Sequence, residues 1–378
     1  MKILHLLGDL RLPQNPDHER SSGVVRAALE FARAQARRGH QPQVVAVGKE
    51  TWQSQWHGVQ LRQLGLMSWA HLGGFDFSIH APYVLLTRQQ HFDVIQGHLY
   101  PYLRFLKAGK RFVHFHSDPF HQGADAHLPN IAAHCDGMVA VSDFIAARIK
   151  QGLPTARVFR VYNGVDHSRF EAQALSQERC AQRKAWGLDQ DQTVFLYAGA
   201  IVPEKGVIHL ARAFAHLAAA NPKVHLAVAG GSALWHQNNG ANGGAEYEQQ
   251  VRTVLEPLGQ QVRLLGLVSA GDMPAVYAAA DALVVPSVWN EPFPLVALEA
   301  LAAGLPIIAS SVGGLPEQVN PKNGLLVAPG DEAGLHKALQ QLATTPTLRQ
   351  QLGQNGREQV APMTWDKAAE ELDEVYTK

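Results

Sequence analysis

Short apolar runs separated by helical patterns divide the first half of the chain into strands and helices. Runs that are apolar throughout are typical of strands buried on both faces of a parallel sheet. A helix is predicted over residues 23–38, because apolar residues recur there at helical spacing and Gly39 follows where a helix end favours left-handed backbone. The predicted strands cover residues 2–7, 43–47, 93–96, 111–116, 137–141 and 158–162.

The same alternation begins again in the second half. Strands are predicted over residues 193–198, 224–229, 262–267, 282–286, 306–310 and 324–327. Helices are predicted between and after them, over residues 207–220, 247–258, 272–279, 295–303 and 332–344. Two successive series of this kind predict an α/β protein with two doubly wound parallel sheets, each a Rossmann-like domain.

The domain boundaries follow from the two series. We expect an N-terminal domain over residues 1–168, a C-terminal domain over 169–360, and a linker near residues 163–177. Residues 361–378 predict a final amphipathic helix that packs back on the N-terminal domain, because its apolar residues need a surface to cover. Those residues are Trp365, Ala369, Leu372 and Tyr376.

Composition narrows the class of protein. The chain has 378 residues, of which 46% are hydrophobic and 17% charged, and this predicts a folded protein of about two domains. No apolar run reaches the roughly 20 residues of a membrane-spanning helix, and the first residues lack the pattern of a signal peptide. Two cysteines, Cys135 and Cys180, give little support to disulfides. We therefore predict a cytoplasmic protein, monomeric or homodimeric, with no nucleic-acid partner.

Charge is distributed unevenly although it sums to zero. Residues 1–165 hold 18 Lys and Arg against 11 Asp and Glu, and the remainder holds 15 against 22. One interpretation is a basic face that meets an anionic acceptor or the inner membrane surface. The other, which we favour, is attraction between two oppositely charged domains.

Two acids eight positions apart, Glu291 and Glu299, carry the strongest chemical signal. Glu291 lies in a Pro-rich loop, and Glu299 lies about a turn inside the helix that starts near Pro294, so both can share one cleft. A carboxylate in an otherwise apolar helix needs donors, which a ribose or sugar diol would supply. The alternative is a buried salt bridge.

Lys205 follows a strand and a Pro-containing turn and precedes the predicted helix over residues 207–220. A cation at a helix start opposes the helix dipole, so an anion such as a diphosphate between them would account for it. The alternative is a solvated lysine that reaches away from the axis.

These stretches together resemble glycosyltransferase family four, also called glycosyl transferases group 1, over almost the whole chain. The family's enzymes are retaining, use nucleotide-sugar donors and have the GT-B fold, in which two Rossmann-like domains face a central cleft. The resemblance is carried by the pair Glu291 and Glu299, the turn ending at Lys205 and Gly206, Val141-Ser142, Asn163-Gly-Val-Asp166, Ser311-Val-Gly-Gly-Leu-Pro-Glu317, Asn323-Gly324 and Trp365.

The resemblance implies a role for each of these site residues. The N-terminal domain would bind the acceptor and the C-terminal domain the donor. Glu299 would bind the donor ribose, Glu291 the donor sugar, and Lys205 the departing diphosphate in place of a metal ion. The first amides of the helix after Pro294 would hold sugar hydroxyls and phosphate oxygens, with those of Phe293 and Leu295 nearest, while Pro294 itself has no amide. Gly8 and Gly23 would allow close backbone approach to the donor phosphate and the acceptor. Gly230, a donor-binding candidate, begins the stretch Gly230-Gly231-Ser232, which precedes residues 238–244; that segment would close over the donor, and the alternative is plain solvent exposure.

One position departs from the family pattern, because Ala200 stands where an Arg usually follows the glycine. That substitution removes a second cation from the phosphate site. Either Lys205 with the helix terminus suffices, or another basic residue substitutes, or the leaving group is held differently. The loss also keeps open a role in binding without catalysis.

In the first half, the strand over residues 111–116 ends in polar groups, where related enzymes place a His beside the reacting sugar. His116 is the candidate. The same segment offers an alternative as a metal cluster, which we disfavour because its spacing matches no recurrent zinc motif. The residues of that alternative are His114, His121, His127, Asp118 and Asp125.

The expected reaction is metal-independent transfer of a hexosyl unit with retention, from a nucleotide sugar, most simply a UDP-sugar, in glycan or glycoconjugate biosynthesis. The acceptor would be a saccharide, a lipid-linked sugar or a small molecule, and no other cofactor is required. Alternatives are a sugar phosphorylase or epimerase of the same fold and a non-catalytic nucleotide-sugar binder. A dinucleotide oxidoreductase is disfavoured because no Gly-x-Gly-x-x-Gly pattern follows a strand.

Overall fold

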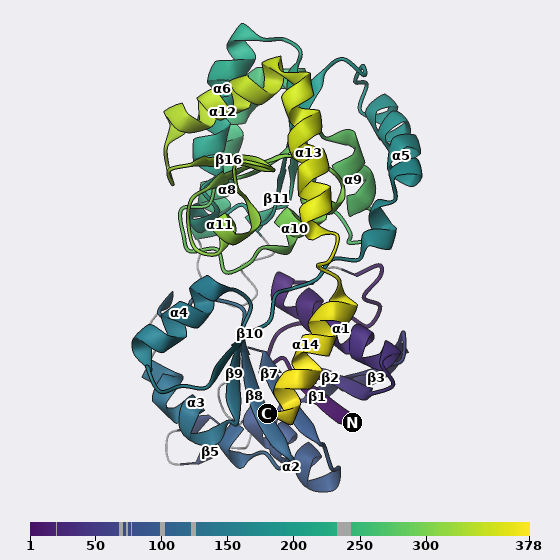
Figure 1. Cartoon of the computed structure of the whole chain (residues 1–378), viewed down its shortest axis with the longest axis vertical. Helices are drawn as coiled ribbons and strands as arrows, with labels where there is room; N and C mark the ends of the chain where they lie inside the picture. Colours follow the sequence, from purple (N-terminus) through teal and green to yellow (C-terminus); the bar gives the residue numbers. More distant parts are fainter. Residues whose placement is uncertain are drawn as a thin grey trace. The chain divides into compact units, whose positions relative to one another are not determined.

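The computed structural model describes residues 1–19, 21–67, 71–72, 75–76, 78–98, 103–121, 126–232 and 243–378. The chain forms two compact units, of which unit 1 comprises residues 1–164 and 363–378 and unit 2 comprises residues 165–362 (Figure 1). The division therefore falls four residues before the sequence-based boundary at 168, and the final helix belongs to unit 1. Each unit is an α/β layer structure around one sheet.

Unit 1 contains an eight-stranded sheet in the order β10-β9-β8-β7-β1-β2-β4-β3, parallel except for the β3–β4 pair. Its strands are β1 (Lys2–Leu6), β2 (Gln41–Gly48), β3 (Trp52–Trp56), β4 (Val59–Gly65), β7 (Val94–His98), β8 (Lys110–Phe115), β9 (Gly137–Ala140) and β10 (Val158–Arg160), with β5 (His71–Leu72) and β6 (Phe75–Asp76) paired separately. Its helices are α1 (Gly23–Arg37), α2 (His80–Gln89), α3 (Leu128–His134), α4 (Asp143–Gly152), α14 (Trp365–Thr377) and the 3-10 turn η1 (Leu103–Phe105).

Unit 2 contains a six-stranded parallel sheet in the order β13-β12-β11-β14-β15-β16. Its strands are β11 (Thr193–Ala198), β12 (Val224–Ala229), β13 (Val262–Gly266), β14 (Ala282–Val285), β15 (Ile307–Ser310) and β16 (Gly324–Val327). Its helices are α5 (Ala172–Ala185), α6 (Val207–Ala220), α8 (Gly243–Leu255), α9 (Met273–Ala279), α10 (Leu295–Ala302), α11 (Leu315–Gln318), α12 (Glu332–Thr344) and α13 (Pro346–Val360), with 3-10 turns η3 (His167–Phe170), η4 (Pro203–Lys205) and η6 (Glu256–Gln261).

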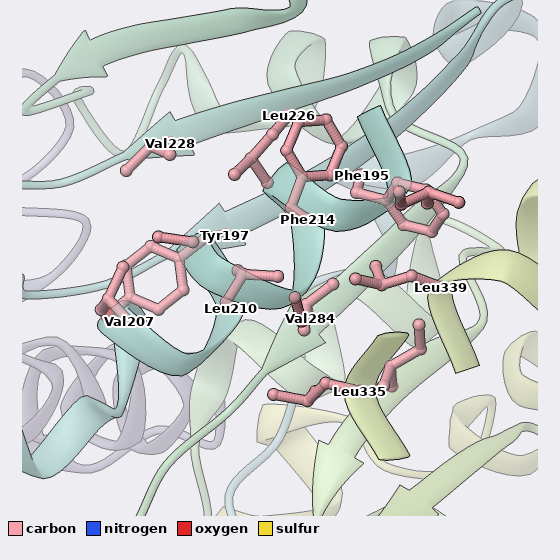
Figure 2. Packing of buried hydrophobic residues seen from close by; sticks show 14 of the residues in the cluster. Phe195, Tyr197, Val207, Leu210, Phe214, Leu226, Val228, Val284, Leu335 and Leu339 are labelled. Carbon is pink, nitrogen blue, oxygen red and sulfur yellow. The ribbon is translucent and has the colours of Figure 1, made fainter. Parts of the chain in front are cut away.

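A hydrophobic core of unit 2 lies between one face of this sheet and helices α6, α8 and α12 (Figure 2). Alternate residues of a strand point to one face, so Phe195 and Tyr197 of β11 and Leu226 and Val228 of β12 face the helices together. From the helices, Phe214 of α6 and neighbouring apolar side chains fill the layer. Burial of such side chains stabilises by about 1.5–3 kcal/mol each, which explains why the strand positions could be predicted.

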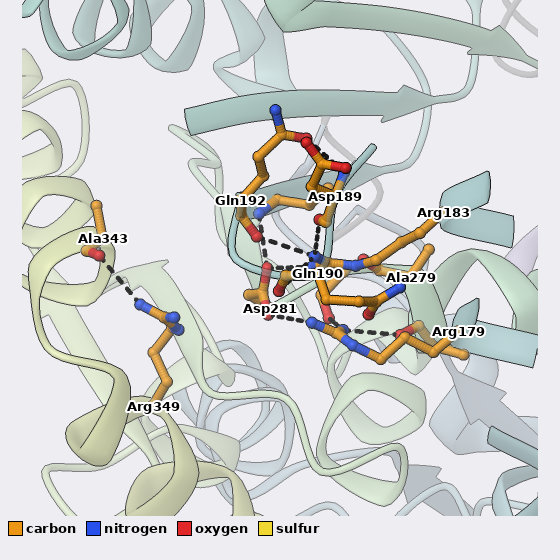
Figure 3. A network of polar contacts seen from close by, with 12 residues as sticks. Arg179, Arg183, Asp189, Gln190, Gln192, Ala279, Asp281, Ala343 and Arg349 are labelled. Carbon is orange, nitrogen blue, oxygen red and sulfur yellow. Dashed lines mark hydrogen bonds and ion pairs between the residues drawn. The ribbon is translucent and has the colours of Figure 1, made fainter. Parts of the chain in front are cut away.

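Helix α5 was missed, since the sequence prediction assigned a linker up to residue 177. Its anchor is Arg183, which is fully buried and donates to carbonyl oxygens of Ala279 at 3.0 Å and Gln192 at 2.9 Å and to Asp281 at 2.5 Å (Figure 3). Asp281 also accepts from Arg179 at 2.8 Å. A polar network rather than an apolar stripe thus holds α5, so hydrophobic periodicity did not reveal it.

Helix α14 packs on α1, as the apolar residues of the tail predicted. Trp365 meets Phe31 edge-on with ring centroids 5.1 Å apart, and Leu372 is fully buried. Gly164 makes room for this helix start, because a Cβ there would lie 2.3 Å from the Trp365 backbone nitrogen.

Two acids of α14 pair with bases at and just beyond the end of α1. Asp366 pairs with Arg37 at 2.7 Å, and Asp373 pairs with Arg38 at 2.7 Å and His40 at 3.0 Å. Part of the basic excess of the first half is therefore met inside unit 1, by the chain's own C-terminal helix. Among the described residues, no helix is both long and apolar enough to cross a bilayer.

Candidate functional site

The strand order of unit 2 reverses between β11 and β14, because the chain leaves β11 toward β13 and then returns through β14 toward β16. In doubly wound sheets, ligands bind at the carboxyl ends of strands at such a reversal. The loop after β11 carries Lys205, and the loop after β14 carries Glu291 and leads into α10 with Glu299. The three charged residues singled out in the sequence therefore follow the two strands where a ligand is expected.

The two loops are in direct backbone contact. Gly206 has a φ of 62°, and a Cβ on it would lie 2.1 Å from the carbonyl oxygen of Pro286. The Val288 amide donates to the Glu204 carbonyl at 2.9 Å. Only glycine meets both the left-handed backbone and the close approach. The glycine after Lys205 thus joins the two loops.

Lys205 lies in the turn η4 and not in α6, which begins at Val207 with Gly206 as its N-cap. Its Nζ is 2.7 Å from Oε1 of Glu291, and it lies 5.0 Å from the centre of the Trp289 ring. The anion beside this lysine is therefore a carboxylate of the protein. The sequence interpretation invoked an anion such as a diphosphate to account for a cation at the helix start; in the structure the helix start is Gly206, and Glu291 is an anion beside the lysine.

Glu291 is 2% exposed, and the same oxygen that meets Lys205 accepts from the Ser287 hydroxyl at 2.5 Å. Its backbone is held by the turn after β15. The Gly314 amide donates to the Glu291 carbonyl at 2.6 Å, and a Cβ on Gly313, whose φ is 58°, would lie 2.2 Å from that carbonyl oxygen. The Gly-Gly pair at 313–314 therefore positions Glu291.

Helix α10 begins after Pro294, whose extended backbone precedes Leu295 and whose carbonyl accepts from Gln318 at 3.2 Å. Its first amides have no partner within the helix, as at any helix start. Phe293 is buried beside them. The roles that the sequence assigns to Phe293, Pro294 and Leu295 stay predictions.

Glu299 is satisfied by protein groups. Its Oε2 accepts from the Tyr277 hydroxyl at 2.8 Å, and its Oε1 lies 3.5 Å from Arg169 of η3. The sequence left open whether a ligand diol or a protein cation satisfies this carboxylate, and in the structure protein groups already supply a hydroxyl and a cation. The side chain is still 20% exposed, and a carboxylate has about four acceptor positions. Arg169 and Tyr277 were missed, because they lie 130 and 22 positions away in sequence.

Gly230 directly follows β12 and packs against Gly199, which directly follows β11. A Cβ there would lie 1.7 Å from the Gly199 carbonyl oxygen, so this glycine has a structural requirement independent of any ligand. Ala200 is buried, and its carbonyl accepts from Tyr197 at 2.5 Å. Of the segment 238–244, for which the sequence suggests closure over the donor, residues 238–242 lie outside the described residues.

In unit 1, Gly8 and Gly23 differ in whether the backbone requires a glycine. Gly8 has a φ of 63°, and its carbonyl accepts from the Val47 amide and the Tyr83 hydroxyl, both at 2.9 Å. Gly23 opens α1 behind the N-cap Ser22, and a Cβ there would meet no described atom within 4 Å. The turn at Gly8 thus needs a glycine for the backbone itself, whereas Gly23 has no such need.

His116 directly follows β8 and is 7% exposed. Its Nε2 lies 2.8 Å from Nδ1 of His98, and burial lowers the pKa of His116 to about 3. The ring is therefore neutral at physiological pH, and it can accept or donate a hydrogen bond without carrying charge.

The metal cluster considered in the sequence does not assemble among the described residues. Asp118 instead pairs with Arg148 at 3.1 Å, and Asp125 lies outside the described residues. The structure groups different histidines, since one ring nitrogen each of His98, His114 and His116 lie within 4.8 Å of one another. Two of these rings are hydrogen-bonded to each other.

His5 and His98 were missed by the sequence analysis. Each interrupts an otherwise apolar strand, as does Gln96. The sheet register pairs His5 with Gln96 and His98 with His114. Polar residues at buried strand positions were the available signal, because a buried polar group needs a partner.

Comparison with protein families agrees with this architecture. Residues 178–359 match the family model described as glycosyl transferases group 1, and residues 21–169 match the model described as glycosyltransferase family 4. The two matches cover most of unit 2 and most of unit 1.

Curated relatives match about two thirds of the chain. A D-inositol 3-phosphate glycosyltransferase of Saccharomonospora viridis is 34% identical over 65% of this chain and 56% of the relative. A GDP-mannose-dependent monoacylated alpha-(1-6)-phosphatidylinositol monomannoside mannosyltransferase of Corynebacterium glutamicum is 30% identical over 67% of this chain and 65% of the relative. The chain thus spans less than two thirds of the length of these relatives.

Solved structures match the whole chain. Sucrose-phosphate synthase of Thermosynechococcus elongatus has a TM-score of 0.80 at 24% identity, covering 100% of this chain and 98% of that one. HepE of Anabaena, in complex with UDP and glucose, has a TM-score of 0.77 at 19% identity, covering 100% of both. Together, the sheet topology, the family models and these likenesses show that the chain belongs to glycosyltransferase family four and has the GT-B fold.

Proposed function

We propose that unit 2 binds a nucleoside-diphosphate sugar and that the protein is a retaining, metal-independent hexosyltransferase. The observation that carries the proposal is the meeting of the Lys205 and Glu291 loops, with Glu299 in the helix that follows, at the strand-order reversal of unit 2. Anionic groups bind where backbone amides and a cation converge. The start of α10 and Lys205 supply these two elements.

Lys205 would act on the leaving group. As the bond to the sugar breaks, negative charge develops on the diphosphate, and a positioned cation in a partly buried site stabilises that charge. A bound diphosphate would compete with Glu291 for the ammonium group. Glu291 would then accept hydrogen bonds from hydroxyls of the donor sugar, and Glu299 from the ribose.

Retention is proposed through attack from the face that the nucleotide leaves. The acceptor hydroxyl would bond to the anomeric carbon while the departing phosphate oxygen takes its proton. Glu291 is the carboxylate near this position. Its Oε1 accepts hydrogen bonds from both Lys205 and Ser287, which favours a role in positioning the donor sugar over a role as the nucleophile. His116 would contact the reacting sugar, as the sequence resemblance implies.

UDP is the proposed nucleotide, with a saccharide, a lipid-linked sugar or a small molecule as acceptor. Support comes from the structure of HepE, which is described in complex with UDP-glucose. The relative from Corynebacterium glutamicum is named as GDP-mannose-dependent, so a guanosine donor is the first alternative to compare with UDP.

The test is calorimetric titration with UDP, GDP, ADP and UMP. We expect UDP to bind, and we expect Lys205→Gln to weaken UDP by about tenfold or more, since hydrogen bonds to charged groups contribute about 1.5–3 kcal/mol. UMP should change little, because it lacks the second phosphate. Lys223→Gln is the matched control, since Lys223 is an exposed lysine of unit 2 that also pairs with an acid, Asp191. Equal losses for UDP and UMP would remove Lys205 from the phosphate site, and no nucleotide binding at all would refute the donor site.

Stereochemistry needs a second measurement. The enzyme is incubated with UDP-hexoses and an acceptor series, and the anomeric coupling constant of the product is read by NMR. An α-linked product from an α-linked donor is expected, and an inverted product would contradict retention.

One observation favours a second candidate, a non-catalytic nucleotide-sugar binder. Ala200 removes a cation from the expected phosphate site, and among the described residues the cations at the two acids are Lys205 and Arg169. Arg169 meets Glu299, at the proposed ribose position, so it does not replace the missing Arg. Donor binding without donor consumption under all acceptor conditions would establish this second candidate.

A further inference from the structure

The core of unit 1 contains a continuous chain of buried polar side chains that the proposed reaction does not use. His5, Gln96, His98 and His114 lie on adjacent strands β1, β7 and β8, and each is at most 1% exposed. Buried polar groups of this kind are costly unless they are hydrogen-bonded to one another.

One arm of the chain ends at His116. Nε2 of His5 lies 2.8 Å from Oε1 of Gln35, and Nδ1 of His5 lies 2.9 Å from Nε2 of His98. Nδ1 of His98 then lies 2.8 Å from Nε2 of His116. Every nitrogen of His5 and His98 is used in this arm.

The other arm ends at His114. Gln35 donates through Nε2 to the Tyr376 hydroxyl at 3.2 Å, and that hydroxyl donates to Oε1 of Gln96. Gln96 donates through Nε2 to Nδ1 of His114 at 2.6 Å. Nε2 of His114 is buried without a partner among the described residues and forms the end of the chain.

These bonds fix the tautomers. A neutral imidazole has one donor and one acceptor nitrogen, and burial lowers the pKa of all four histidines, so the rings are neutral. Because Gln35 accepts through Oε1, His5 must donate through Nε2 and accept through Nδ1. The same alternation then makes His98 donate through Nε2, and His116 must donate through Nε2 to the remaining acceptor of His98.

We propose that this chain from Tyr376 and Gln35 through His5 and His98 holds His116 as the Nε2–H tautomer, so that its Nδ1 is the acceptor available to a substrate hydroxyl. No described residue occupies Nδ1. The residues behind His116 are positioning residues, and only His116 is assigned contact with the sugar. That last contact rests on the proposed function, whereas the tautomer does not.

The donor-to-acceptor directions of the hydrogen bonds depend on one another along this series of side chains. If one amide turned over, each following ring would have to exchange its donor and acceptor nitrogens. Tyr376, in the C-terminal helix, therefore influences the chemistry of a ring at the end of β8 through four successive hydrogen bonds. A hydroxyl that served packing alone would have no such effect.

The primary experiment is ¹⁵N NMR of the full chain labelled at histidine, with signals assigned by single His→Gln variants. In the wild type we expect His116 to carry its proton on Nε2 between pH 6 and 8. In Tyr376→Phe the ring stays in place but the link between Gln35 and Gln96 is lost, so we expect His116 to populate both tautomers. Tyr162→Phe, which removes a hydroxyl bond to Asp143 elsewhere in unit 1, should leave the His116 signals unchanged.

The kinetic readout separates positioning from folding. If half of the molecules hold the wrong tautomer, binding selects the competent half, so the KM for the donor should rise by about twofold with kcat little changed. A smaller folded fraction would instead lower the apparent kcat and leave KM unchanged. The KM of His98→Phe should rise further, and His225→Phe, which replaces a buried histidine of unit 2, is its control.

Three results would overturn the proposal. They are an Nδ1–H tautomer of His116 in the wild type, His116 signals unchanged in both Tyr376→Phe and His98→Phe, and one equivalent of Co²⁺ bound with a visible absorption band that His98→Phe abolishes. The last would assign His98, His114 and His116 to a metal site. The NMR readout stands even if no sugar is transferred, so a failure of the proposed function is distinguishable.

Discussion

Units 1 and 2 both place polar side chains where the strand order reverses, but they satisfy them differently. In unit 2 the loops hold an ammonium and a carboxylate 2.7 Å apart, with Lys205 20% exposed. In unit 1 the strands themselves hold neutral rings at β1, β7 and β8, and three of the four are at most 1% exposed.

The difference follows from the exposure of Lys205 and from the absence, in the described part of the chain, of a counter-charge at the rings. Lys205 is partly exposed and can exchange its buried partner for a charged ligand, whereas the rings of unit 1 are bonded to one another and to neutral side chains and stay neutral. Unit 2 is therefore suited to bind an anion, and unit 1 is suited to present one ring in a defined protonation state.

The largest expected effect comes from changing the charged pair of unit 2. Lys205→Gln keeps a hydrogen bond to Glu291 but removes the charge, so the transfer rate should fall by about 10²–10³-fold, as when one transition-state donor is lost. Steady-state kcat measures it. Lys223→Gln should behave as wild type, and an unchanged kcat in Lys205→Gln would contradict leaving-group stabilisation.

The second prediction concerns the buried histidines of unit 1 and the pH dependence of the free energy of unfolding. Burial lowers the pKa of His5 to about 4 and of His116 to about 3, whereas unfolded histidine titrates near 6.5. Below pH 6.5 the unfolded chain therefore binds protons that the folded chain excludes. The free energy of unfolding should fall as pH drops from 6.5 toward about 4, by about 2 kcal/mol per buried histidine at pH 5.

Urea denaturation at pH 7.5, 6.0 and 5.0 measures this loss. His116→Gln should reduce the pH dependence by up to one proton, while His91→Gln should not, since the His91 side chain is 75% exposed. A pH-independent free energy of unfolding across this window would show that the folded and unfolded chains bind equal numbers of protons, and it would contradict the lowered pKa of the buried rings.

A smaller effect is expected from changing Glu299 in unit 2. Glu299→Gln should weaken UDP by about tenfold, because a neutral amide replaces a charged acceptor at the ribose. Stability should change little, since Arg169 lies 3.5 Å away, beyond an ideal hydrogen bond. Glu332→Gln, another partly exposed acid of unit 2, is the control for calorimetry. Equal UDP affinity in Glu299→Gln and wild type would place the ribose elsewhere.

The smallest expected effect is none. EDTA should leave the transfer rate unchanged, because Lys205 is proposed to do the work of a metal ion. The rate is measured with and without EDTA alongside metal content by mass spectrometry. Activity lost with EDTA and restored by a divalent cation would contradict metal independence and draw attention to His98, His114 and His116.

Much of the fold could be predicted because strands buried on both faces have continuous apolar sequences. The predicted strands at 193–198, 224–229 and 324–327 coincide with β11, β12 and β16, and the helix predicted at 207–220 coincides with α6. Two of the missed elements share a cause, since α5 is held by Arg183 and β3 exposes alternate residues. Neither segment shows a continuous apolar pattern.

The sequence alone determined the two α/β series, the family and the residues that carry charge at the unit 2 loops, because local burial and motif spacing are properties of neighbouring positions. Only the tertiary structure decided the partners. Lys205 and Glu291 are 86 positions apart, and His5 and His98 are 93 apart. Strand register and loop contact bring such residues within 3 Å, and neither can be read from spacing along one chain.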